Sequence, residues 1–323
     1  MDKLSPAVLE AFGVHGRRMK KEKGRFIFDM PEGLGIIHTT PEPAQAIVLR
    51  HSVKERLAER GFPWTDRYRL ATTGSPYILI GRETYVMTLC PRESRETDFE
   101  NEGATLQAFE FLARFHIAAA EMPALPIPHM PPIEEVYSRQ LGELAQAGKQ
   151  ARRGPRMSDF DVLFIKHSPH YIQTMEDSIS RLAQTGYAKL YGEALRRGSL
   201  CHNSLKEENL LAADEFTYVI NFVEAATGPQ VSDLAALIRR YAQRSSKSIP
   251  MGRLLEAYDR VNPLPVGVGD ILYPLLNFPW AFTKIASQYY SKKRNWAPVG
   301  LISRMEAVLA GRESYEKYIA INA

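Results

Sequence analysis

The first ninety residues combine short apolar stretches with turn-forming residues. Apolar and β-branched runs bounded by Gly, Pro or charged residues predict β-strands. One segment has helical spacing instead, because Ile47, Val53 and Leu57 form an apolar stripe within residues 43–60, and Gly61 follows it. We therefore expect a small β-sheet with one helix packed on it. The expected strands are residues 25–29, 34–39, 77–80 and 84–89.

Beyond this region the pattern becomes helical. Residues 90–94 are polar and include a proline, which favours a hinge, and the proline-rich residues 122–132 predict an extended connector. Elsewhere apolar residues recur at helical spacing. We therefore expect an α+β, bilobal protein with a small β-rich N-terminal lobe (1–92) and a larger, mostly helical C-terminal lobe (93–323). The expected helices are 102–120, 133–150, 158–189, 192–197, 231–242, 251–261, 268–276, 280–291 and 299–316.

Composition and charge exclude several classes of protein. Hydrophobic residues make up 45% and charged residues 24%, as in globular proteins, and a net charge of +4 is too small to indicate a nucleic-acid partner. Two cysteines, Cys90 and Cys201, indicate a reducing compartment without structural disulfides. We expect neither a secretory signal nor a membrane span, and therefore synthesis in the cytoplasm.

A polar loop just after residue 200, and the apolar strand that follows it, hold the candidate chemistry. Ser204 comes two residues after His202 and Asn209 comes seven after it, while the strand ends in Asn221. This spacing is that of a kinase catalytic loop and its metal-binding strand. In active kinases the positions of Ser204 and Asn221 hold aspartates, one the catalytic base and the other a metal ligand.

These motifs resemble the protein-kinase-like fold, specifically its aminoglycoside-phosphotransferase-like branch, and within it the bacterial spore coat proteins of the CotS family. The loop resembles that family's Leu-Cys-His-Gln-Asp loop with its Gly-Asn-Leu-Leu end. The strand resembles its Val-Ile-Asp-Phe strand. About the last two-thirds of the chain carries the resemblance well, and the N-terminal lobe carries it only by pattern. Further matching segments are Val231-Ser232-Asp233-Leu234, Leu255-Glu256-Ala257-Tyr258, Asn262-Pro263-Leu264, Phe278-Pro279-Trp280 and Tyr289-Tyr290-Ser291-Lys292-Lys293.

The resemblance implies a role for each matching residue. Ser204 stands at the position of the base, and a hydroxyl does not accept a proton near pH 7, where general acid–base catalysis contributes about 10²–10⁴ in rate. Asn221 stands at the metal-ligand position without the negative charge that Mg²⁺ coordination favours. Asn209 matches a metal-binding amide. His202 and Asp233 match residues that shape the loop.

The resemblance also implies a phosphate-binding lysine on the strand at residues 34–39 and a partner glutamate on the next helix. The matching residues are His38 and Glu55, and an imidazole is a poor substitute for an ammonium group. Glu207 and Glu208 lie near the base position, but not at the family's spacing. The catalytic base, the metal-binding carboxylate and the lysine of the family are all replaced in this chain. We therefore assign no cofactor, and ATP and Mg²⁺ remain the candidates that the resemblance implies.

Three hypotheses compete, and we favour the first, with the second as its alternative and the third as its complement. The first is a catalytically inactive pseudokinase that is a structural or binding component of the spore coat, with other coat proteins as partners. The second is a divergent ATP- and Mg²⁺-dependent small-molecule phosphotransferase of the aminoglycoside or choline kinase type, whose metal is held by Asn209, Asn221 and Glu224. The third is an interaction module that binds through the aromatic and basic residues 289–296, although a helix end packing its tyrosines is the simpler interpretation. None of them involves nucleic acid or a membrane.

Overall fold

The computed structural model describes residues 4–122, 125–153, 157–213, 216–246, 248–291 and 299–321. The described chain forms two compact units. Unit 1 is Met1–Pro128 with Arg197–Thr227, and unit 2 is His129–Arg196 with Gly228–Ala323. The expected lobe boundary after residue 92 stays a prediction, since these units divide the chain at other positions.

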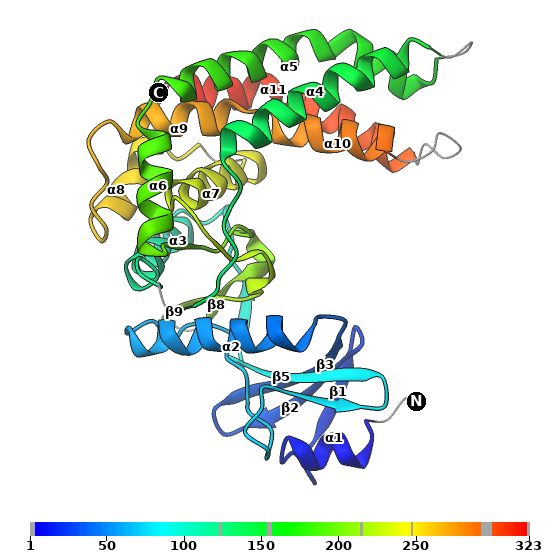
Figure 1. Ribbon diagram of the computed structural model, residues 1–323, viewed down its shortest axis with the longest axis vertical. Helices are drawn as coiled ribbons and strands as arrows, with labels where there is room; N and C mark the ends of the chain where they lie inside the picture. The colour runs from blue at the N-terminus through cyan, green and yellow to red at the C-terminus, as the bar shows by residue number, and fades with distance from the viewer. Residues whose placement is uncertain are drawn as a thin grey trace. The chain divides into compact units, whose positions relative to one another are not determined.

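The N-terminal part of unit 1 is an antiparallel sheet in the order β1-β2-β3-β5-β4 (Figure 1). The sequence predicted four of these strands and missed β1, whose four residues are all exposed. β1 and β2 are joined by Lys23 and Gly24, both with positive φ (47° and 77°), the backbone of a tight two-residue hairpin. The strands are β1 (Met19–Glu22), β2 (Arg25–Met30), β3 (Gly33–Thr40), β4 (Tyr77–Ile80) and β5 (Glu83–Cys90).

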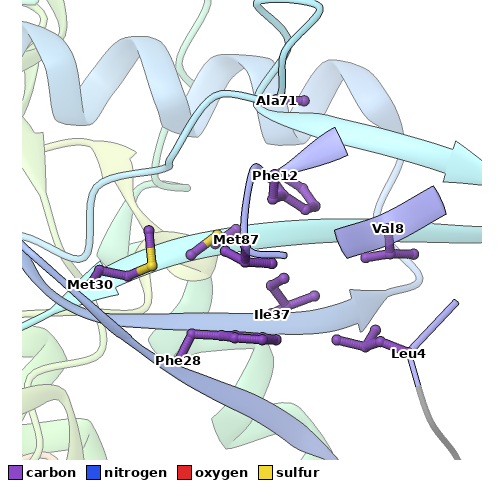
Figure 2. Close-up of a cluster of buried hydrophobic side chains, with 9 residues drawn as sticks. Leu4, Val8, Phe12, Phe28, Met30, Ile37, Ala71 and Met87 are labelled. Carbon is purple, nitrogen blue, oxygen red and sulfur yellow. The ribbon is translucent and has the colours of Figure 1, made fainter. Parts of the chain in front are cut away.

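Two helices lie on opposite sides of this sheet, α1 (Pro6–Ala11) and α2 (Ala44–Glu59) (Figure 1). Ser5 caps α1 by accepting from the Val8 backbone N–H. Apolar side chains of α1 and of the sheet form one buried cluster, which Figure 2 shows. Ile37 belongs to this cluster, so the next residue of the strand, His38, points to the other face. The cluster consists of Leu4, Val8, Phe12, Val14, Phe28, Met30, Ile37, Ala71 and Met87.

The rest of unit 1 is one helix and two small sheets. α3 (Glu102–Ala118) begins at Asn101, whose side chain accepts from the Ala104 backbone N–H, and it buries an apolar face that includes Phe109 and Leu112. β6 (Ser94–Glu96), β8 (Leu210–Ala213) and β9 (Phe216–Val219) form one sheet, and β7 (Leu200–Cys201) pairs with β10 (Ala226–Thr227). The polar loop that holds the candidate chemistry therefore lies between β7 and β8, anchored by strands at both ends.

Unit 2 is helical in its described residues. The predicted helix at 158–189 ends earlier, at Ala183, and a new helix starts at Tyr187 after a turn that contains Gly186. α4, α5, α10 and α11 run side by side in Figure 1, and α4 packs on both α5 and α10. The helices are α4 (Ile133–Ala151), α5 (Asp159–Ala183), α6 (Tyr187–Arg197), α7 (Val231–Arg244), α8 (Met251–Asp259), α9 (Val268–Asn277), α10 (Trp280–Ser291) and α11 (Val299–Ile321).

The expected α+β class is thus confirmed, with strands grouped toward the N-terminus and helices dominating the remainder. Over the residues described, no helix is both long and apolar enough to cross a membrane.

Phe28 is 1% exposed in the cluster between α1 and the sheet. We expect Phe28→Ala to lower the free energy of unfolding by about 3–5 kcal/mol, because it removes a buried ring and leaves a cavity. Urea unfolding measures this loss. Leu79→Ala is the control, because Leu79 is 66% exposed on the same sheet and its truncation should change stability by less than about 0.5 kcal/mol. Equal losses in the two variants would contradict the assignment of this core.

Candidate functional site

His202 fixes the polar loop against the end of strand β9. Its side chain is fully buried, Nδ1 lies 3.3 Å from the Ser204 backbone nitrogen, and Nε2 lies 3.0 Å from the Ile220 carbonyl oxygen. A backbone N–H can only donate and a carbonyl oxygen can only accept, so Nδ1 is the acceptor and Nε2 carries the proton. His202 therefore bridges the loop and the strand as a neutral ring, which is an architectural role.

Ser204, Asn209 and Asn221 form one hydrogen-bonded set. The Asn209 side-chain NH₂ group donates to the Ser204 carbonyl oxygen at 2.8 Å and to Ser204 Oγ at 3.1 Å. The Asn221 NH₂ group donates to Asn209 Oδ1 at 3.4 Å. The structure thus brings together the three residues that the sequence placed at the base and metal positions, and all three are uncharged.

Asn221 adopts the left-handed backbone conformation, with φ 67° and ψ 66°. Asparagine tolerates this conformation better than most residues with a side chain. The same holds for Asn203, with φ 59°, whose side chain donates to the Glu224 carbonyl oxygen at 3.0 Å. The backbone turns at Asn203 and Asn221 therefore fix the position of the Asn221 backbone, from which its exposed side chain extends.

The neighbouring carboxylates do not assemble into a metal site. Glu208 is exposed and pairs with Lys206 at 2.7 Å, and the Glu224 side chain is exposed. Within the described ranges, no three His, Cys, Asp or Glu side chains are grouped so that they could hold a metal ion. A metal at this loop would depend on the amide oxygens of Asn209 and Asn221 and on oxygens that a ligand brings with it.

His38 on β3 is a neutral, half-buried side chain. Burial lowers its pKa, and the positive charge of Arg25 lowers it further. Its Nδ1 atom is buried, with no hydrogen-bond partner among the residues that the structure describes. At the position where the resemblance implies a lysine, this chain presents no permanent positive charge.

The buried cation of this region is Lys54 on α2, which sequence reasoning missed. Its side chain is 2% exposed, and Nζ lies 2.6 Å from Asp66 Oδ1 and donates to the Asp66 carbonyl oxygen at 2.7 Å. Nζ also lies 4.5 Å from the ring centroid of Tyr68 and 5.5 Å from that of Phe222. Lys54 is therefore enclosed by the segment after α2 and by the residue that follows Asn221.

Glu55, the predicted partner of the nucleotide lysine, is used elsewhere. Both of its carboxylate oxygens accept from the guanidinium of Arg67, with Arg67 Nε at 2.9 Å from Oε1, and His51 Nδ1 lies 3.8 Å away. Neighbouring residues on a helix point in different directions, so Glu55 faces Arg67 while Lys54 faces the interior. Helical periodicity could have indicated that Lys54 is buried, because it lies seven residues, about two turns, after buried Ile47 and therefore on the same face of α2.

Asp233, predicted to shape the loop, lies in the first turn of α7 and is 1% exposed. It belongs to unit 2, whereas the loop belongs to unit 1, so its role in supporting the loop stays a prediction.

The tyrosines of residues 289–296 pack onto α5. Tyr289 stacks on Phe160 with ring centroids 3.9 Å apart and shares a 2.8 Å hydrogen bond with Ser158, and the Tyr290 hydroxyl donates to Asp161 Oδ1 at 2.9 Å. These contacts support the simpler interpretation of this segment as a packed helix end. Its basic part, residues 292–296, lies outside the described residues.

Comparison with solved structures defines the class of fold. An aminoglycoside phosphotransferase from Alicyclobacillus acidocaldarius subsp. acidocaldarius DSM 446 superposes with a TM-score of 0.85 at 17% identity, over 99% of this chain and 96% of that one. AMP-bound spectinomycin phosphotransferase APH(9)-Ia gives a TM-score of 0.69 at 14% identity, over 98% of both chains. Amicoumacin kinase hAmiN in complex with AMP-PNP, Ca²⁺ and Ami gives a TM-score of 0.59 at 12% identity, over 93% of this chain and 88% of that one. The chain therefore has the aminoglycoside-phosphotransferase-like kinase fold.

The sequence narrows this class to one family. The family described as "Spore coat putative kinase YutH" matches residues 7–321, and the chain belongs to it. The resemblance to spore coat proteins of the kinase-like fold is thereby confirmed. Among curated protein sequences, none matches the chain.

Lys54 gives the first test of the site. We expect Lys54→Met to lower the free energy of unfolding by about 3–5 kcal/mol, because the Asp66 carboxylate loses its partner in a largely buried position. Urea unfolding measures the loss, and Lys54→Met combined with Asp66→Asn should recover part of it. The control is Lys20→Met, since the Lys20 pair with Glu22 is exposed and contributes at most about 1 kcal/mol. A loss no larger than that of the control would show that the pair does not stabilise this region.

His38 gives a test by pH. Its folded-state pKa lies below 6.5, so the unfolded chain binds more protons as the pH falls through about 6.5 and stability decreases on acidification. We expect His38→Gln to reduce this slope between pH 7.5 and 5.5, with some slope remaining because burial also lowers the pKa of His51 and His167. Unfolding free energies at several pH values measure it. An unchanged slope would mean that His38 is not held neutral by the fold.

Proposed function

We propose that this protein is a catalytically degenerate kinase-fold protein that serves the spore coat as a structural or binding component. One observation carries the proposal: the base and metal positions, Ser204, Asn209 and Asn221, are uncharged and hydrogen-bond to one another. The amides satisfy the polar groups of the loop, so its architecture needs neither a carboxylate nor a metal ion.

Phosphoryl transfer depends on positioning and on electrostatic stabilisation of the transferred group. The Ser204 hydroxyl does not act as a general base near neutral pH. His38 is neutral, and the Lys54 ammonium is enclosed and paired with Asp66. The positions that supply charge in an active kinase therefore hold uncharged groups here. The buried cation nearby, Lys54, is already paired with Asp66 within the fold.

The alternative is a divergent phosphotransferase, and the exposure of Asn221 beside Asn209 favours it. The two side chains carry amide oxygens, and an exposed amide can offer its oxygen to a metal ion that the phosphates of a nucleotide also coordinate. The exposed Glu224 would then be a third oxygen donor. In this case the negative charge that Mg²⁺ requires comes mainly from the nucleotide, with ATP as the phosphate donor.

The coat role is supported by membership of the spore coat family alone. A fold can be shared by proteins with unrelated functions, so the fold by itself does not assign this role. The proposed partners are other coat proteins, and the proposed location after synthesis in the cytoplasm is the spore coat.

Thermal unfolding with ATP, with and without Mg²⁺, tests the state of the loop. We expect no Mg²⁺-dependent rise in Tm, because the metal positions carry no charge. A ligand at 100 times its Kd would stabilise the fold by about 2.7 kcal/mol, a readable shift. A rise with ATP alone would indicate a nucleotide bound as a structural ligand. A rise that needs Mg²⁺ would favour the phosphotransferase alternative.

Restoring the two carboxylates is the sharper comparison. The variant Ser204→Asp with Asn221→Asp should gain Mg²⁺-dependent stabilisation by ATP that the parent lacks, since Asn221→Asp adds charge at constant size and Ser204→Asp adds a carboxylate that is two heavy atoms larger than the hydroxymethyl group it replaces. Asn203→Asp is the matched control, because it adds a carboxylate to the same loop outside the base and metal positions. Phosphorylation of an aminoglycoside or amino alcohol by the parent, lost in Asn209→Ala, would overturn the proposal.

A further inference from the structure

Unit 2 contains a cavity of about 460 Å³ bordered by α5, α7, α10 and α11. The space exists because several lining positions carry small residues, among them Ala281, Ala307 and Gly311. A Cβ atom added to Gly311 would meet no atom within 4 Å. A volume of this size is in the range of small-molecule sites.

Aromatic rings form part of the cavity wall. Tyr171 and Phe282 stack with their centroids 3.9 Å apart, which holds both rings in fixed positions. Trp280, which also lines the cavity, lies 4.9 Å from Phe278, centroid to centroid. Preformed aromatic faces of this kind favour a flat, unsaturated ligand.

Two arginines supply positive charge to the same cavity. Arg239 lies over Trp280, with its guanidinium carbon 5.9 Å from the ring centroid, and donates to the Leu275 carbonyl oxygen at 3.2 Å. Arg312 lies at the limit of an ion pair with two carboxylates, since its Nη2 is 3.9 Å from Glu313 Oε1 and its Nε is 4.0 Å from Glu316 Oε1. Glu316 also lines the cavity, so its charge there is opposed by two arginines. Glu316 is held more closely by His170, at 2.7 Å.

Two polar atoms at the cavity are buried without a hydrogen bond to any described residue, Arg312 Nε and the Tyr171 hydroxyl. Tyr171 is 5% exposed, and burial raises its pKa to about 12, so the hydroxyl is protonated at neutral pH. Tyr171 and Arg312 both line this cavity. Both are donors, and a buried donor without an acceptor is costly. The missing partner is therefore an acceptor, and the arginines favour one with negative charge.

We propose that this cavity binds a small aromatic carboxylate. Its planar carboxylate matches guanidinium groups, which recognise carboxylates through paired N–H donors, and its ring matches the aromatic wall. The site belongs to unit 2 and shares no residue with the loop of Ser204, Asn209 and Asn221. It would therefore act independently of any nucleotide chemistry and provide this spore coat protein with a small-molecule ligand.

The test measures binding of 2-naphthoate to the full chain by isothermal titration calorimetry. We expect saturable binding, weakened at least tenfold in Arg312→Gln and in Arg239→Gln. The control is Arg304→Gln on the same helix α11, since Arg304 is exposed, does not line the cavity and donates to Gln288 Oε1 at 3.2 Å. The uncharged amide 2-naphthamide should bind at least tenfold more weakly than 2-naphthoate. Absence of binding up to 10 mM, or equal affinity for the amide, would overturn the proposal.

Gly311→Leu distinguishes loss of the site from loss of the fold. Leucine favours helix more than glycine does and extends into empty space, so the variant should keep or raise the Tm of the unliganded protein. It should also weaken binding of 2-naphthoate at least tenfold, because Gly311 lines the cavity and is exposed at its rim, where a leucine side chain would narrow the opening. Unchanged affinity in Gly311→Leu would place the ligand elsewhere on the protein and overturn the assignment. Tight binding of 2-naphthyl phosphate with weak binding of 2-naphthoate would reject a carboxylate in favour of a phosphate ester.

Discussion

The contact between Lys54 and Asp66 joins separate segments of unit 1 around one buried charge. It ties helix α2 to the segment that leads back into the sheet, and the same ammonium lies against the ring of Phe222. One charge therefore links the helix, the sheet and the loop after Asn221. Removing a buried charge from such a position leaves its partner unsatisfied, so the three elements are held together by a constraint that is expensive to break.

The loop after β7 is held together by side chains that carry no charge. Asn209 donates to both the backbone and the side chain of Ser204 and accepts from Asn221, so each side chain has a polar partner. An amide can donate and accept, whereas a carboxylate can only accept. A carboxylate pair would need a cation between its members, and the amide network does not. A loop without carboxylates at these positions is therefore compatible with a well-ordered fold.

Local patterns predicted the elements that depend on local physics. Helix α3 and most strands follow from hydrophobic spacing, and the residue set around Asn209 follows from the spacing of a short loop. β1 was missed because its residues are exposed and mostly charged, which leaves no alternation to detect. The break before Tyr187 was missed because both sides of it have helical spacing.

Tertiary contacts decided the remaining features of the site. Lysine in a helix is usually solvated, and only the packing of α2 on the sheet and on Phe222 makes Lys54 a buried residue. The neutral state of His38 likewise comes from burial and from charges that are distant in the sequence. The cavity in unit 2 is lined by helices that are far apart in the sequence, from α5 to α11, so no spacing rule could indicate it.

The hairpin between β1 and β2 has a consequence for anything that binds against the His38 face of the sheet. The connection is the two residues Lys23 and Gly24, both in left-handed conformations that close the strands as tightly as a hairpin allows. A turn this short has no slack with which to fold over a bound molecule. The connection between β1 and β2 therefore could not supply a flap that controls the residence time of a ligand on this face.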